Sequence, residues 1–149
     1  MDSIKIIALA IVVMLAVYAP IMLWNRRKTA QLIRETEDSL TVSGEHAVLG
    51  PMGVLFYEPI LRWLGMRARH GVVTLTDDRL IIRPLVGPET DIPLADIAKV
   101  WKSKWYNASH GAGYTHVALK LEDGQRFAIL VKDPRPWMER LGKQVRSNQ

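Results

Sequence analysis

The first pattern in the chain is an uninterrupted apolar run near its beginning. Residues 6–24 carry no charge, and the basic residues Arg26, Arg27 and Lys28 follow almost at once. At about 1.5 Å per residue, such a run forms a helix of about 28 Å, close to the ~30 Å thickness of a bilayer's hydrocarbon core. The pattern therefore predicts one membrane-spanning helix over residues 4–25.

Two other interpretations of this segment fit the residues less well. A cleaved secretory signal carries its positive charges before the apolar run, whereas here the basic cluster follows it. A buried core helix has one polar face, whereas this segment is apolar on all sides. Tyr18 and Trp24 also lie toward the end of the run, where aromatic side chains of spanning helices meet the membrane interface. A spanning helix is therefore favoured.

The charges that flank the run predict its orientation. Arg26, Arg27 and Lys28 follow the run, whereas Lys5 at the other end is opposed by Asp2. By the positive-inside rule, the C-terminal side stays in the cytoplasm. We expect a single-pass protein of the cell (inner) membrane, with its N-terminus outside and its domain cytoplasmic. The absence of cysteine from the sequence fits that reducing compartment.

Alternation of apolar and polar positions begins farther along the chain. Residues 26–43 predict a helical extension of the anchor that passes into a juxtamembrane linker. Residues 72–76 and 79–83 are rich in β-branched side chains and flank the turn residues Asp77 and Asp78, which predicts a hairpin. Further strands are expected at residues 90–94, 97–106, 114–121 and 126–131.

The end of the chain changes period again. Asp133 can cap a helix, and Pro134 suits a first helical turn. Trp137, Leu141 and Val145 then recur every fourth residue, so they share one helix face. The fold class is therefore mainly β with a C-terminal α-helix, arranged as a small barrel or sandwich that the helix covers.

Three segments resemble the bacterial PH-like and GRAM-like domains. Gly44–Leu49 opens the similarity, Gly71–Ile82 resembles their G-x-x-x-L-T-x-x-R-L hairpin, and Ile92–Ile97 resembles their I-P-x-x-x-I step into the next strand. The resemblance implies a PH-like bent barrel of seven strands with a C-terminal capping helix over residues 44–149, preceded by one transmembrane helix. Such domains bind lipids, peptides or protein partners and are not enzymes.

One apolar segment is a candidate contact surface. Met52–Met66 is crowded with large apolar residues, includes Arg62 and Trp63, and is followed by Arg67 and Arg69. An apolar segment with a tryptophan and basic residues is typical of chain that enters a headgroup region. The alternative is a first strand plus a hydrophobic loop packed under the barrel. Periodicity over so short a segment leaves both open.

A second candidate surface lies in the strand expected at residues 97–106. In a strand, Trp101 and Trp105 share one face, and Lys102 and Lys104 share the other. Together these residues could anchor at a membrane interface or contact a partner. Alternatively, the two tryptophans fill the barrel against Trp137.

Motifs that carry chemistry do not stand out in the sequence. It has no Gly-x-Ser-x-Gly elbow and no phosphate-binding loop, and its four histidines lack zinc-like spacing. We therefore expect no enzyme activity, no metal and no cofactor. The formal charge of +5 lies in the part after the apolar run. Beside a membrane, such a surplus favours anionic lipid over nucleic acid as a partner.

Two functions remain. The first is a single-pass, membrane-anchored PH-like module on the cytoplasmic face that binds a protein partner or anionic lipid. The alternative is a structural accessory subunit of a larger membrane complex or transporter. Small residues within the apolar run would let other helices approach closely in such a complex; they are Ala8, Ala10, Ala16 and Ala19.

The basic cluster yields a test of orientation. A reporter fused to the C-terminus should be active in the cytoplasm, because Arg26, Arg27 and Lys28 hold that side of the helix inside. Replacing the three residues with neutral ones should produce a mixed orientation, measured as a fraction of reporter activity on the other side. A wild-type reporter active only outside the cytoplasm would contradict this orientation.

Overall fold

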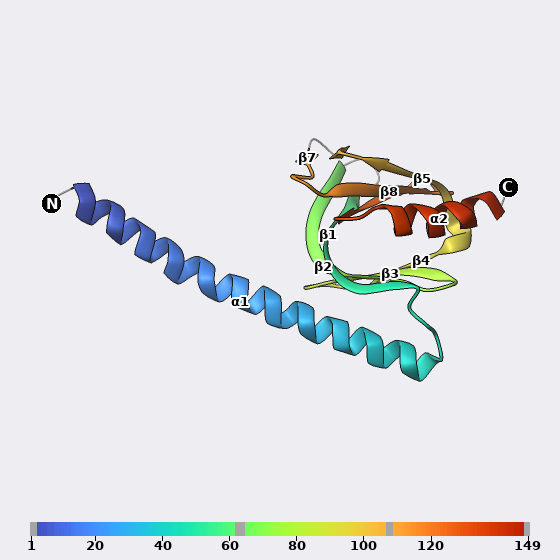
Figure 1. Ribbon diagram of the computed structural model, residues 1–149, viewed down its shortest axis with the longest axis horizontal. Helices are drawn as coiled ribbons and strands as arrows, with labels where there is room; N and C mark the ends of the chain where they lie inside the picture. Colours follow the sequence, from blue (N-terminus) through green and yellow to red (C-terminus); the bar gives the residue numbers. More distant parts are fainter. Residues whose placement is uncertain (1–2, 62–64, 107–108, 148–149) are drawn as a thin grey trace.

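A computed structural model gives the arrangement of the chain and describes residues 3–61, 65–106 and 109–147. Its N-terminal part is one helix, α1 (Ser3–Ser43), which contains Pro20 and runs through residues 26–43 without a break (Figure 1). The apolar half of α1 is exposed on every side, and none of its described residues up to Trp24 is buried. By length and composition, this is one helix that could cross a membrane.

The rest of the chain forms a curled antiparallel sheet. Seven strands pair in the order β4-β3-β2-β1-β9-β8-β5, and two very short strands form a separate hairpin. The strands are β1 (Leu49–Leu61), β2 (Gly65–Leu75), β3 (Arg79–Pro84), β4 (Thr90–Pro93), β5 (Ile97–Ser103), β6 (Trp105–Tyr106), β7 (Ser109–His110), β8 (Thr115–Leu121) and β9 (Arg126–Val131).

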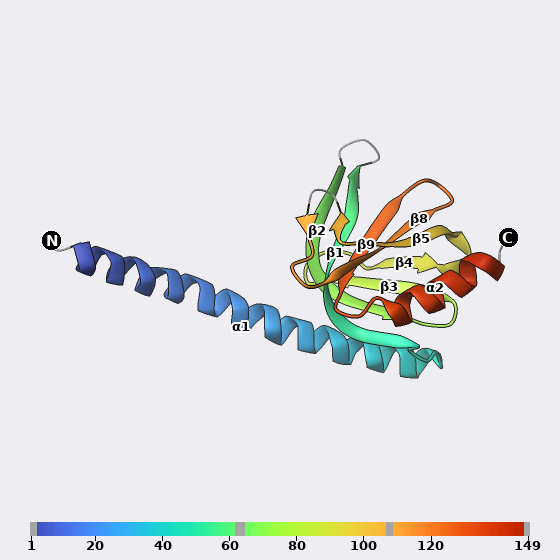
Figure 2. The same ribbon diagram turned by 45° about the horizontal axis from the view of Figure 1, so that its top comes forward.

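The two edges of the sheet meet at one corner. The 3₁₀ turn η1 (Leu94–Asp96) joins β4 to β5, and the C-terminal helix α2 (Arg135–Ser147) packs against η1 and β5 (Figure 2). Trp137 and Leu141 are buried on the inner face of α2, against the side chains that the strands turn inward. The fold is the expected PH-like half-barrel, mainly β with a C-terminal helix.

Most of the expected elements are confirmed, but the strand at residues 97–106 is not continuous. It ends at Ser103, the chain bends at Lys104, and β6 pairs with β7 rather than with the main sheet. The side-chain hydroxyl of Ser103 accepts a hydrogen bond from the backbone N–H of Trp105 (3.1 Å), which stabilises the bend. A polar side chain that bonds the backbone two residues on competes with the sheet ladder.

The interpretation that both tryptophans fill the barrel against Trp137 is wrong. Side chains alternate along β5, so Val100 packs toward the interior while Trp101 packs on the outer face of the sheet. Trp105 lies beyond the bend and is 64% exposed. Trp137 therefore shares the interior with aliphatic side chains, Phe56 and Phe127, not with these two residues.

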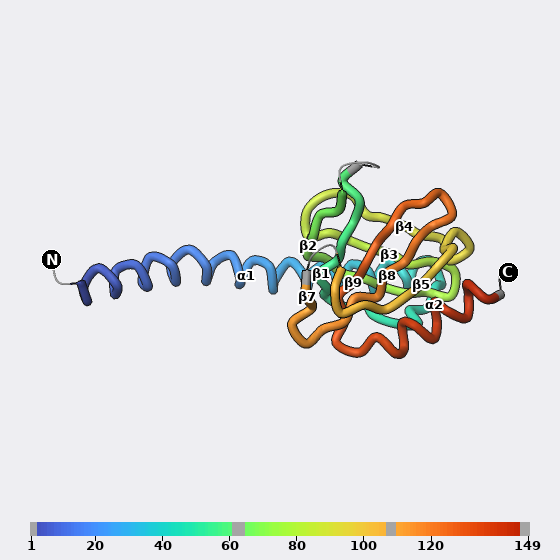
Figure 3. The backbone as a smooth tube through the Cα atoms, turned by 90° about the horizontal axis from the view of Figure 1, so that it is seen from above, coloured from blue at the N-terminus to red at the C-terminus, as the bar shows by residue number. Residues whose placement is uncertain are grey.

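The second half of α1 packs on the outer face of the sheet. The chain reverses at Gly44, which has a positive φ of 72°, so that the sheet lies beside α1 and not beyond its end (Figure 1). Leu32 contacts Val72 and Leu85, and the guanidinium of Arg83 donates a hydrogen bond to Thr36 Oγ1 (3.1 Å). The view from above shows that the domain lies beside only this half of the helix (Figure 3).

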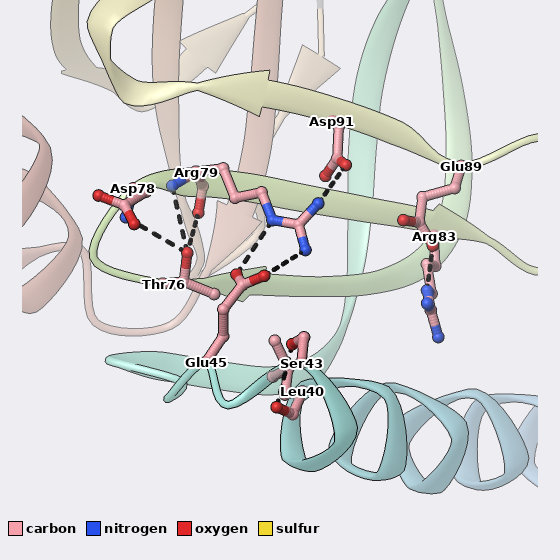
Figure 4. Close-up of polar contacts among 9 residues, drawn as sticks. All are labelled: Leu40, Ser43, Glu45, Thr76, Asp78, Arg79, Arg83, Glu89 and Asp91. Atoms are coloured by element: carbon pink, nitrogen blue, oxygen red, sulfur yellow. Dashed lines mark hydrogen bonds and ion pairs between the residues drawn. The ribbon is translucent and has the colours of Figure 1, made fainter.

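One arginine fastens the connection between α1 and the sheet. Arg79 in β3 donates hydrogen bonds to both carboxylate oxygens of Glu45, at 3.1 and 2.7 Å, and to Asp91 in β4, at 2.5 Å (Figure 4). The hydrogen bond from Arg79 is the main cause that lowers the pKa of Glu45 below its usual value. The segment after Ser43 is therefore held against the β2–β3 hairpin.

The position of Trp137 tests the closing helix. Trp137→Ala should reduce the free energy of unfolding by about 3 to 5 kcal/mol, because it removes a buried side chain and leaves a cavity. Thermal unfolding of the full chain in detergent, followed by near-ultraviolet circular dichroism, measures the loss. Trp137→Phe should lose less, and an unchanged melting temperature for Trp137→Ala would exclude this packing.

Candidate functional site

The apolar segment at Met52–Met66 belongs to a long hairpin of β1 and β2. Glu58 of β1 pairs directly with Arg67 of β2. Its side chain is only 10% exposed and accepts hydrogen bonds from Arg67 Nε and Arg69 Nη1, each at 2.7 Å. Two of the arginines proposed as lipid contacts therefore neutralise a buried carboxylate.

Arg69 also makes a second contact inside the domain. It donates a hydrogen bond to the backbone carbonyl of Val86 and so ties the β3–β4 turn to the hairpin. Its side chain is 20% exposed, whereas that of Arg67 is 52% exposed. Removing one partner of a buried ion pair destabilises a fold by several kcal/mol. Of the two, Arg67 presents more of its charge to an external anion.

The other candidates of this group are placed as follows. Arg62 and Trp63 lie outside the described residues. Arg26 and Arg27 are exposed and Lys28 is half-buried, at the point where the apolar half of α1 gives way to the half that packs on the sheet.

Lys102 and Lys104 are both exposed, and they lie on either side of Ser103, where β5 ends. Trp105 is the most exposed of the described aromatic residues outside α1, and its ring lies 4.9 Å from that of His110 across the β6–β7 hairpin. Trp101 is half-buried, with the ammonium of Lys99 at 6.0 Å from its ring centroid. The structure thus separates Trp105 from Trp101, which the sequence had placed on one face.

An aromatic cluster lies under the β6–β7 hairpin on the outer face of the sheet. His116 of β8 is fully buried, and its ring centroid lies 5.3 Å from that of Tyr57 and 5.8 Å from that of Tyr106. Tyr57 and Tyr106 also meet edge to face at 5.7 Å. These rings pack with Ala118 and Trp101 into a second, smaller core.

His116 is the unusual member of this cluster. Neither of its ring nitrogens has a hydrogen-bond partner among the described residues. Burial is the main cause that lowers its pKa, and the nearby backbone of Ser103 partly offsets the shift. A neutral imidazole is therefore the form that the folded domain favours.

A groove between β5 and α2 was not found from the sequence. It has a volume of about 470 Å³ and is lined by Ala98, Lys99, Val100, Gly142, Val145 and Arg146. A Cβ added at Gly142 would meet nothing within 4 Å, so the missing side chain opens this side of α2. A glycine inside an otherwise amphipathic helical pattern was the signal available in the sequence.

Among the described residues, no group of three or more histidine, cysteine, aspartate or glutamate side chains is arranged to hold a metal ion. The groove offers backbone, apolar side chains and two basic side chains, which suit recognition of a peptide or protein segment.

Several solved structures show a weak similarity to this chain. The C-terminal domain of an unknown protein from Leishmania infantum is similar over 74% of this chain and 94% of its own, with 10% identity and a TM-score of 0.48. The DH/PH domains of p115-RhoGEF match 74% of this chain with 12% identity and a TM-score of 0.40. The Vav1 exchange factor, described by its PH and C1 domains, matches 80% with 17% identity and a TM-score of 0.41.

The chain spans 33% and 36% of the lengths of the two exchange-factor chains. No protein-family profile and no curated protein sequence matches the chain. The evidence for the class of fold is therefore the strand order and the closing helix of this chain.

The buried histidine predicts how stability depends on pH. The pKa of His116 is lowered in the folded domain. The unfolded chain therefore binds more protons than the folded chain as the pH falls through the ordinary histidine pKa of about 6.5. Stability should therefore be full above pH 7 and decrease between pH 7 and 5. Melting temperatures of the full chain in detergent measure this decrease.

His116→Phe should flatten that pH profile, because a phenylalanine ring fits the aromatic cluster and cannot be protonated. His46→Gln, at an exposed position, is the matched control and should keep the wild-type profile. An equally steep profile in His116→Phe would contradict the assignment.

Proposed function

We propose that this chain is a single-pass, membrane-anchored PH-like module that binds a protein partner on the cytoplasmic face of the cell membrane, and that it is not an enzyme. The observation that carries this proposal is the groove between β5 and α2 beside an unpaired sheet edge. The continuous helix α1 and its basic cluster support the anchoring and the orientation.

The free edge of β5 is the first reason to expect a peptide in the groove. Among the described residues, β5 pairs only with β8 in the main sheet, so its other edge carries backbone groups free to pair with an added strand. A partner segment in extended form can add to such an edge and place alternate side chains in the adjoining groove. The open space at Gly142 would receive one of them.

The charges around the groove indicate which segments fit. Lys99 and Arg146 line it, whereas Arg140 and Lys143 line a separate pocket beside the β2–β3 turn, where Lys143 also pairs with Glu139. A segment with acidic side chains beside apolar ones would complement this surface, and the complementary charges would raise the rate of association.

Anionic lipid is the other ligand that the basic surplus suggests. The ion pairs of Glu58 argue against Arg67 and Arg69 as its main contacts, because both arginines already serve a buried carboxylate. Substituting them would change the stability of the hairpin together with any lipid binding. Lys102 and Lys104 are better positions at which to test lipid binding, because both are exposed and their substitution should change the stability of the hairpin less.

The structural accessory subunit remains the second candidate. The observation in its favour is the exposure of the apolar half of α1 on every side, with Ala8, Ala16 and other small residues at its surface. Purification in mild detergent distinguishes the two candidate functions. A partner bound to the helix should still co-purify when the groove is blocked, whereas a partner bound in the groove should be lost.

Gly142 provides that test. Gly142→Ala should raise stability by up to about 1 kcal/mol, because alanine favours a helix and its Cβ meets nothing within 4 Å. Gly142→Gln should fill the groove and release the partner that co-purifies with the wild-type chain, as measured by quantitative mass spectrometry. Gly142→Ala is the matched control, and it should retain more of the partner. Full retention by Gly142→Gln with a normal melting temperature would contradict the proposal.

A further inference from the structure

The reversal of the chain at Gly44 turns one end of the domain toward the apolar half of α1. Three connections lie at that end: the β3–β4 turn, the β6–β7 hairpin and the loop before β8 (Figures 1 and 2). The view from above shows the same end facing the N-terminal part of the helix (Figure 3). If α1 spans a bilayer, these connections are the part of the domain nearest to it.

Exposed apolar side chains gather on these connections. Val86 in the β3–β4 turn is 66% exposed, Trp105 in β6 is 64% exposed and Tyr114 before β8 is 49% exposed. These are the three most exposed large apolar side chains among the described residues after α1. Single exposed apolar residues are ordinary, but a group on one end of a domain marks a contact surface.

The turns at the opposite end of the domain carry exposed acidic side chains. Its β2–β3 turn carries exposed Asp77 and Asp78, and its β8–β9 turn carries exposed Glu122 and Asp123 (Figure 1). Acidic side chains are repelled by the negative surface of a cytoplasmic leaflet, whereas the exposed Lys102 and Lys104 near the aromatic end are attracted to it. The exposed lysines therefore agree with the orientation that the apolar residues favour.

The position along α1 agrees with contact at the interface. Tyr114 lines the same groove as Thr29 and Gly53, where α1 and the sheet lie close together. Thr29 lies five residues after Trp24, which is about 7.5 Å along a helix. The polar headgroup layer on each side of a bilayer is about 5 to 8 Å thick. Tyr114 is therefore held at the outer boundary of that layer.

The three connections are also held in place from within. Arg69 donates a hydrogen bond to the carbonyl of Val86, and the ring of His110 lies against that of Trp105 at an angle of 54°. The backbone N–H of Ala112 donates to His110 Nδ1 at 3.2 Å, which ties the loop before β8 to the same hairpin. A surface ordered in advance loses little conformational entropy when it binds.

We propose that Val86, Trp105 and Tyr114 form a second membrane contact, which seats in the interfacial layer of the leaflet from which α1 emerges. Tryptophan and tyrosine suit this layer because each has an apolar ring and a polar group. The contact fixes the domain on the bilayer and leaves α2 and the groove at Ala98, Lys99 and Val100 on the side away from it. This inference rests on the membrane anchoring by α1 proposed above.

Site-directed spin labelling tests the contact directly, since the chain contains no cysteine. Single variants Val86→Cys, Trp105→Cys and Tyr114→Cys of the full chain are labelled and reconstituted into vesicles of phosphatidylcholine and phosphatidylglycerol. Collisions with oxygen, which partitions into lipid, are compared with collisions with a water-soluble nickel chelate. Glu122→Cys reports on the far end of the domain, and Ala16→Cys reports on the anchor.

The ratio of oxygen to nickel collisions should be several-fold higher at residues 86, 105 and 114 than at residue 122. In the Val86→Cys chain, Trp105→Ser with Tyr114→Ser should lower the ratio, whereas Gln125→Ser, at an exposed position in the β8–β9 turn, should not change it. If the labels at residues 86, 105 and 114 are as exposed to water as the label at residue 122, the proposed contact is wrong. If the label at residue 16 is immersed in lipid in the same experiment, the anchoring by α1 still stands.

A label at residue 16 that meets only water overturns both the anchoring and the contact. Labels at the three positions that are shielded from both reagents indicate packing between copies of the chain, which also overturns the membrane contact.

Discussion

The packing of the second half of α1 on the outer face of the sheet determines the rest of the arrangement. Leu32 and Leu40 are buried there, Thr29 lies close to Gly53, and Thr36 accepts a hydrogen bond from Arg83. A helix that continued past the apolar run without this contact would carry the domain on a free stalk. With it, the domain lies beside the helix, and Arg79 holds the returning chain.

Several charges that suggest an external ligand serve the fold instead. Arg69 and Arg67 neutralise Glu58, which is almost fully buried, and Arg83 bonds both Glu89 and Thr36. An excess of basic residues in a sequence is therefore a poor guide to the basic surface of the protein, because arginines that pair with acidic side chains of the domain add little positive charge to that surface. The lysines near the end of β5 remain exposed and determine more of the field outside.

The two proposed contacts use different parts of the barrel and are compatible. The aromatic end faces the apolar half of α1, whereas α2 and the groove beside β5 lie on the other side of the domain (Figure 1). A domain seated on a bilayer at one end would present its groove toward the interior of the cell. Membrane contact would then orient the groove for a soluble partner and would not compete with it.

The sequence by itself determined the long apolar helix, most strands and the closing helix, because each depends on the period of apolar residues within one segment. It also predicted burial of Trp137 and Leu141. The tertiary structure alone decided which way Trp101 and Trp105 face, since one bend at Lys104 breaks the alternation. It also brought Val86, Trp105 and Tyr114 to one end, because contacts between residues far apart in the chain leave no periodic pattern.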